Sequence, residues 1–161
     1  MMPYTLDDID TISDTDYNKF YRYLIIGTSL GKGRGIFAGR NFRKNQIVEI
    51  APYIGDTSSG FQDYIFLSHL SQYESVLVLG YGSIYNHSND PNVKYTLLSS
   101  DDKIENAYFV YYANRDIPKG GEMLISYGRG WWRSRNLAPK IPNSDSDSDA
   151  TDIIKKKYLR R

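Results

Sequence analysis

The feature that most constrains the fold is a succession of short β-branched and aromatic runs, many of them closed by glycine, proline or asparagine. Runs of this length and composition are typical of strands. They do not alternate regularly with helical segments, as they would in a layered α/β fold. The sequence therefore predicts a mainly β domain with few short helices. Predicted strands lie at 21–26, 36–38, 46–51, 75–79, 94–98, 107–113 and 123–125.

Length and composition exclude several classes of protein. The chain has 161 residues, as expected for one domain, and no apolar run approaches the roughly 20 residues that span a bilayer. The acidic N-terminus has no apolar h-region and does not resemble a secretory signal. Cysteine is absent, and His69 and His87 are the only histidines, so no metal site is expected. The net charge of +1 gives no overall basic field for nucleic acid.

A polar turn follows the apolar run 75–79 and its glycine-rich continuation. Residues 86–92 read Asn-His-Ser-Asn-Asp-Pro-Asn, and they come directly after the short aromatic stretch that ends at Tyr85. Turn-forming residues packed this closely behind a strand indicate backbone that is shaped for a functional site.

A glycine-rich segment, residues 31–35 with the sequence Gly-Lys-Gly-Arg-Gly, follows the first predicted strand. A strand followed by spaced glycines also occurs in dinucleotide-binding Rossmann units, where a helix begins at the phosphate. Residues 36–39 are too short and too β-like for that helix, so the Rossmann interpretation fails. Two alternatives stay open. The segment is a hairpin in which glycine only relieves strain, or a close backbone approach with cationic side chains for a flat anionic ligand.

Three segments in order, 31–37, 86–92 and 121–128, resemble the SET-domain protein lysine methyltransferases. The resemblance implies a SET-domain (β-clip) fold of several small sheets, with a C-terminal pseudoknot that brings residues 86–88 beside 126–128. It also implies S-adenosyl-L-methionine as the methyl donor, bound on one face. The substrate lysine is expected to enter by a narrow channel from the opposite face.

The resemblance assigns roles to individual residues. Tyr127 matches the catalytic tyrosine at the methyl-transfer site. Trp132 is expected to pack on the adenine and Trp131 to line the lysine channel; the alternative is that both tryptophans only cap the core. Core packing is likewise the alternative for Tyr81 and Tyr95. In full, the expected cofactor-binding residues are Lys32, Gly33, Arg34, Tyr64, Asn86, His87 and Trp132, and the expected substrate-binding residues are Tyr81, Tyr95 and Trp131.

Methyl transfer explains why these residue types are needed. The reaction is an in-line displacement that depends on proximity and alignment more than on acid–base catalysis. The lysine attacks as a neutral amine, and burial in an apolar channel lowers its pKa. A hydroxyl such as that of Tyr127 orients the amine, and no motif places a carboxylate as general base.

Two function hypotheses from different classes follow. The first is an S-adenosylmethionine-dependent lysine N-methyltransferase that acts on a histone tail or another protein, in the nucleus or on chromatin. The second is a non-catalytic SET-type module that binds a partner peptide. Tyr127 and the pair Asn86-His87 favour catalysis, because a module without turnover needs neither. A homodimer that completes a substrate groove is a further hypothesis, and no membrane partner is expected.

We expect three regions along the chain. Residues 1–20 form a lead-in, 21–137 the SET domain with a short aromatic post-SET segment, and 138–161 a low-complexity tail that is acidic and then basic. The tail cannot bury enough apolar surface to offset its ordering entropy. Its basic end, 155–161, raises a third hypothesis of nucleic-acid binding, but the acidic stretch 143–149 would repel phosphate. Direct nucleic-acid binding is therefore not expected.

Overall fold

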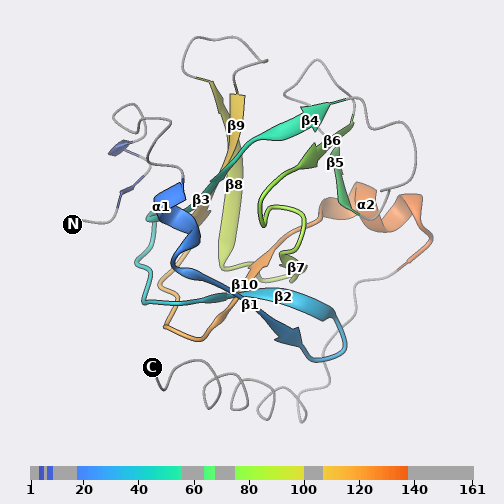
Figure 1. Cartoon of the computed structure of the whole chain (residues 1–161). Coiled ribbons are helices and arrows are strands. Elements are labelled where there is room, and N and C mark those ends of the chain that lie inside the picture. The colour runs from blue at the N-terminus through green and yellow to red at the C-terminus, as the bar shows by residue number, and fades with distance from the viewer. Residues whose placement is uncertain are drawn as a thin grey trace.

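The computed structural model describes residues 4–5, 7–8, 18–55, 64–67, 75–99 and 107–137. Within these residues the chain forms ten strands in three small sheets and two short helices (Figure 1). This confirms the predicted mainly β fold of several small sheets. In chain order the elements are α1 (Asn18–Tyr21), β1 (Leu24–Ser29), β2 (Gly33–Ala38), β3 (Ile47–Ala51), β4 (Tyr53–Gly55), β5 (Ile65–Leu67), β6 (Ser75–Val78), β7 (Asn86–His87), β8 (Val93–Ser99), β9 (Ala107–Ala113), β10 (Glu122–Ile125) and α2 (Gly128–Ser134).

The first sheet has the strand order β1–β2–β10–β7. Strands β1 and β2 form an antiparallel hairpin whose register runs from Leu24 opposite Ala38 to Ser29 opposite Gly33. The glycine-rich segment is therefore the tip and second strand of a hairpin, which both sequence alternatives allow.

Strand β10 produces the C-terminal pseudoknot. It is the last strand along the described chain, yet it lies between β2 and β7, antiparallel to the first and parallel to the second. Asn86 stands opposite Leu124, and His87 stands opposite Ile125. The backbone N–H of Ser88 extends the pairing by donating to the Ile125 carbonyl at 2.9 Å. The predicted meeting of residues 86–88 with 126–128 is confirmed.

The second sheet, β3–β9–β8, forms the centre of the molecule. All five residues of β3 are buried, which is unusual for a strand and requires cover on both faces. Ile47 and Ile50 pack with Phe20, which precedes the end of α1, while Val48 and Ala51 join the main core cluster. The third sheet, β4–β6–β5, lies above α2 in Figure 1.

Element boundaries differ from the sequence expectation at both ends of the described domain. The first strand begins at Leu24 rather than at residue 21, because α1 continues through Tyr21. Aromatic residues fit a helical turn and a strand equally well over so short a run. The tail 138–161 lies outside the described residues. In the described ranges, no helix is both long and apolar enough to cross a membrane.

Candidate active site

Tyr127 is held at its backbone and at its hydroxyl by two residues, Tyr85 just before β7 and His87 within it. Its backbone N–H donates to Nδ1 of His87 at 3.1 Å, and its hydroxyl donates to the Tyr85 carbonyl at 2.8 Å. Burial, with the nearby Glu122 and Tyr64, raises the pKa of Tyr127 to about 12. The phenol therefore stays protonated, and its proton is committed to the Tyr85 carbonyl. Its oxygen lone pairs are left to face a ligand.

His87 is held as a neutral imidazole. Because Nδ1 accepts from the Tyr127 N–H, the ring proton is on Nε2, which donates to Oδ1 of Asn89 at 3.1 Å. Burial lowers the pKa of His87, the positive charge of Lys32 lowers it further, and the bond to Asn89 opposes both effects. The ring thus ties the polar turn to the residue that carries the reactive hydroxyl.

Asn86 links the polar turn to the glycine-rich hairpin. Its Nδ2 donates to the Arg34 carbonyl at 3.0 Å and to Oε1 of Glu122 at 2.9 Å. The second carboxylate oxygen of Glu122 accepts from the Ser29 hydroxyl at 2.9 Å. A Cβ on Gly35 would lie 2.5 Å from Glu122 Oε1, so glycine is required there by close approach. Both amide protons of Asn86 are used, which leaves Oδ1 as the acceptor for a ligand.

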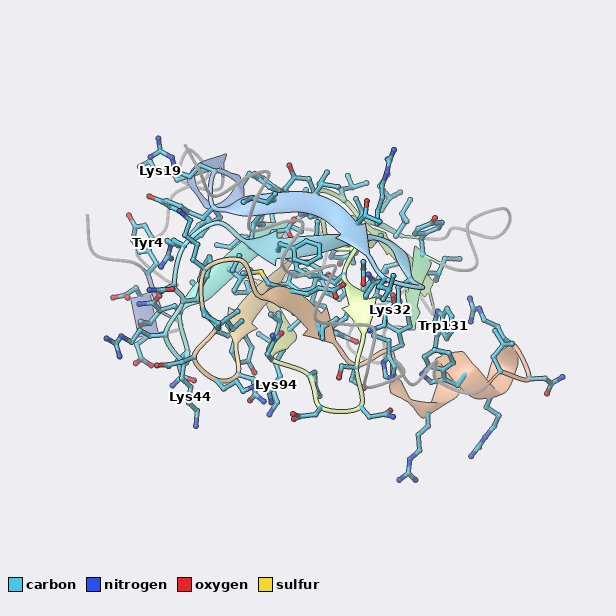
Figure 2. All side chains as sticks on the ribbon, turned by 90° about the horizontal axis from the view of Figure 1, so that it is seen from below. Tyr4, Lys19, Lys32, Lys44, Lys94 and Trp131 are labelled. Carbon is cyan, nitrogen blue, oxygen red and sulfur yellow. The ribbon has the colours of Figure 1, made fainter. Side chains whose placement is uncertain are left out.

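The hairpin tip is open at Gly31 and Gly33. Gly31 and Gly33 have φ angles of +71° and +81°, and no atom lies within 4 Å of where their Cβ atoms would be. Between them, Lys32 is close enough to lower the pKa of His87. Figure 2 shows Lys32 and Trp131 toward the same end of the molecule, beside α2. The cationic tip therefore faces the aromatic residues that follow Tyr127.

The two tryptophans of α2 pack around Tyr127 and His87. The Trp132 ring is 4.9 Å from His87 and stacks at 6.0 Å on Tyr127, measured between ring centroids. Its Nε1 is buried and has no hydrogen-bond partner in the described part of the chain. The Trp131 ring is 4.8 Å from Tyr127, and the guanidinium of Arg135 lies 4.2 Å from the Trp131 ring centre.

Tyr127 also lines a pocket of about 290 Å³. Tyr127, Tyr64, Tyr95 and Trp131 contribute aromatic walls. Of the described residues that line the pocket, none carries a carboxylate or an imidazole, and Arg129 alone is charged. Among the described residues, no group of three or more metal-ligating side chains is placed to hold an ion.

The structure separates the expected site residues into two groups. Lys32, Gly33, Arg34, Asn86, His87 and Trp132 gather around the hairpin tip and β7. Tyr95 and Trp131 line the pocket with Tyr127. Tyr64, expected with the cofactor, lines this same pocket, where its side chain is 52% exposed.

Tyr81 lies apart from both groups. Its ring packs edge-on against Tyr21 at 5.4 Å, and its backbone N–H donates to Glu49 at 2.7 Å. It is not among the residues that line the pocket. Sequence reasoning missed Glu122, which accepts from Asn86, and Ser29, which donates to Glu122. The place of Glu122 in the third resembling segment was a signal for it, and Ser29 offered none.

Comparison with known proteins agrees with this geometry. Residues 33–128 match the family model of the SET domain. A Schizosaccharomyces pombe histone-lysine N-methyltransferase, specific for lysine 37 of histone H3, is 32% identical over 127 residues, which is 71% of this chain and 83% of that protein. The crystal structure of a candidate histone methyltransferase from Plasmodium falciparum is 33% identical and superposes with a TM-score of 0.57, covering 68% of this chain and 96% of that one.

A more distant structure shares the fold. KRYPTONITE, solved with methylated DNA, a histone H3 peptide and S-adenosylhomocysteine, is 21% identical with a TM-score of 0.55, and the match covers 77% of this chain and 26% of that one. The family model spans more than half of the 161 residues, and residues 86–87 bond both Arg34 in the hairpin and Tyr127. The chain belongs to the SET-domain family of protein lysine methyltransferases, which take their methyl group from S-adenosylmethionine.

Proposed function

We propose that the chain methylates a lysine of a histone tail, and that histone H3 is its substrate. One observation carries this proposal: Tyr127 stands between two different environments. The hairpin tip, Asn86 and His87 form the first, which we assign to one flank of Tyr127. An aromatic pocket, whose described lining holds no carboxylate, forms the second, which we assign to the other flank. A donor and an acceptor that meet at one hydroxyl from opposite sides is the arrangement that an in-line displacement needs.

The first flank fits S-adenosylmethionine. Oδ1 of Asn86 accepts from an ammonium group, and Lys32, beside the open space at Gly33, receives a carboxylate. The buried, unpartnered Nε1 of Trp132 supplies a donor beside His87. When bound, the cofactor supplies a methyl group on a positively charged sulfur.

The pocket suits a neutral amine. Loss of water in the pocket and the positive charge of Arg129 disfavour an ammonium, so a lysine that enters it loses its proton more easily. The Tyr127 hydroxyl donates to the Tyr85 carbonyl, so its oxygen accepts from the N–H of the amine and orients the nitrogen. The phenol does not act as a base, because its proton is held with a pKa of about 12. Tyr95 and Trp131 position the aliphatic stem of the lysine, and Tyr64 lies over it at the exposed edge.

The choice of a histone follows the relatives. The S. pombe enzyme is named for lysine 37 of histone H3, and that residue is the first target to test. Action on a histone places the chain on chromatin.

We also propose that residues 21–137 form the domain, and that a homodimer completes the substrate groove. Light scattering tests the second: a monomer mass at assay concentration contradicts it.

The test uses recombinant histone H3 with S-adenosylmethionine carrying a labelled methyl group. The expected result is label on the Nζ atom of lysine 37, located by tandem mass spectrometry. An H3 with arginine at position 37 is the matched substrate control, and Asn86→Ala is the matched enzyme control. The control enzyme is expected to lose transfer together with affinity for S-adenosylhomocysteine.

The outcomes separate the levels of the proposal. Label on another histone lysine moves the target and leaves the reaction intact. Label on lysine 37 by both wild type and Asn86→Ala would contradict the assignment of the cofactor face. No label in any histone lysine, from a protein that binds S-adenosylhomocysteine, would refute histone methylation.

A further inference from the structure

A buried carboxylate lies behind the active site and plays no part in the reaction described above. Glu49, on β3, is 0% exposed. It accepts the Tyr81 N–H on Oε1 and the Tyr85 hydroxyl on Oε2, each at 2.7 Å. The Tyr21 hydroxyl is a third donor to it. A buried acid with three donors is costly to desolvate, and a purely structural core position would be filled more cheaply by an apolar side chain.

The neighbouring backbone is shaped around this carboxylate. A Cβ on Gly80 would lie 2.6 Å from Glu49 Oε1 and 2.5 Å from the Tyr21 hydroxyl. The turn that leads into β7 is therefore built to let its amide reach the acid. Gly80, Tyr81 and Tyr85 are accounted for by contacts with Glu49 rather than by the cofactor.

Tyr85 connects the acid to the reactive hydroxyl. Its ring is 1% exposed and stacks on Tyr111 at 4.9 Å with an interplanar angle of 25°. Its hydroxyl is held by Glu49, and its backbone carbonyl accepts the Tyr127 hydroxyl at 2.8 Å. The same residue precedes Asn86, which is the first residue of β7. The position of the Tyr85 carbonyl therefore depends on a ring that stacks on Tyr111 and whose hydroxyl is bonded to Glu49.

We propose that Glu49 is a positioning residue for Tyr127. Its carboxylate holds the phenol of Tyr85, and Tyr85 holds the Tyr127 hydroxyl through its carbonyl. The inference rests on the proposed function, since it assigns Glu49 to the alignment step of that reaction. Small errors in the alignment of a nucleophile lower the rate strongly, because the reaction depends on a near-attack geometry.

The groups that face Glu49 from the elements around it are tyrosines. They are Tyr21 at the end of α1, Tyr85 before β7 and Tyr111 on β9, and burial is the largest cause of the raised pKa of each. All three stay neutral near pH 7. Burial raises the pKa of Glu49 to about 7, against the opposing effect of its three donors. Protonation of Glu49 would give the carboxyl a proton of its own to donate, and one of its three donors would then lose its acceptor.

The test compares two deletions of a single hydroxyl from the same carboxylate. Tyr85→Phe removes the donor that leads to Tyr127. Tyr21→Phe removes the donor on α1, which bonds the same carboxylate from a different element. Glu49→Gln keeps the shape and removes one acceptor. Turnover is measured on histone H3 and S-adenosylmethionine, with affinity for S-adenosylhomocysteine by calorimetry and unfolding free energy by denaturant for each variant.

We expect kcat to fall about tenfold in Tyr85→Phe and in Glu49→Gln, with KM for H3 and cofactor affinity within about twofold. The double variant falls no further, because both changes break one chain of contacts. Tyr21→Phe keeps kcat within about twofold at a similar loss of stability. A kcat close to wild type in Tyr85→Phe, or an equal fall in Tyr21→Phe, overturns the proposal.

A second measurement does not depend on turnover. The ¹³Cζ chemical shift of Tyr127 reports the hydrogen bond of its hydroxyl. It is expected to move in Tyr85→Phe and Glu49→Gln and to stay in place in Tyr21→Phe. An unchanged Tyr127 resonance in all three refutes the link to Glu49. A moved resonance in a protein that labels no histone refutes only the proposed function.

Discussion

The burial of Glu49 predicts an unusual dependence of stability on pH. Its pKa is about 7 in the folded chain against an ordinary value of 4.5. Between these two values the folded protein keeps a proton that the unfolded chain has lost. Because the folded state binds more protons there, the contribution of Glu49 is fully present below pH 4.5 and is lost as the pH rises through 7.

The magnitude follows from the size of the difference. A gap of about 2.5 pH units, at about 1.4 kcal/mol for each, gives about 3 kcal/mol. The side chain is fully buried, so solvent does not screen this energy. Most acidic residues behave in the opposite way, since they lose stability as the pH falls.

The assay is denaturant unfolding of the wild type and of Glu49→Gln at intervals from pH 4 to pH 8. All other titrating groups are common to both proteins and cancel in the difference. The wild type is expected to lose about 3 kcal/mol relative to the variant across this range, with most of the change between pH 4.5 and 7. A difference that stays flat, or that grows in favour of the wild type as the pH rises, would refute the reasoning.

Three further predictions concern the site itself. Tyr127→Phe removes the hydroxyl that orients the amine, so kcat should fall at least about 100-fold with unchanged affinity for S-adenosylhomocysteine; a smaller loss in single-turnover assays would contradict that role. Gly35→Ala places a Cβ 2.5 Å from Glu122 and 2.7 Å from Asn86, so calorimetry should show cofactor affinity weakened about tenfold or more. The pKa of His87 should lie below 6.5 by NMR of its ring protons, because burial disfavours the imidazolium; a value above 6.5 would contradict the dominance of burial.

Local pattern predicted the strands better than it predicted their partners. The predicted strand 107–113 coincides with β9, Ala107–Ala113, because its aromatic and β-branched residues fit a central strand. β7 pairs with β10 although their paired residues are almost 40 positions apart in the sequence. The two strands between them in the chain, β8 and β9, belong to another sheet. No periodicity encodes such a pairing, and only the resemblance to a known family placed Asn86 beside Tyr127.

The two carboxylates that organise the site could not be found from the pattern. Glu49 and Glu122 are charged residues within or beside apolar runs, which ordinarily indicates a solvent-facing position. Their partners come from distant segments: Tyr81 and Tyr85, which donate to Glu49, are more than 30 positions away, and the hydroxyl that bonds Glu122 is 93 positions away. Tyr64 shows a related limit. It lies next to the three-residue strand β5. A pattern this short does not predict on which side of Tyr127 the Tyr64 side chain lies.

The central claim is that Tyr127 separates a cofactor face from a lysine pocket. A crystal structure of the chain with S-adenosylhomocysteine and a histone H3 peptide tests it most directly. We expect the cofactor to lie against Asn86, His87 and Trp132. We expect the lysine stem to lie between Tyr95 and Trp131, with its nitrogen at the Tyr127 hydroxyl. S-adenosylhomocysteine within the aromatic pocket, or both ligands on one flank of Tyr127, would contradict it.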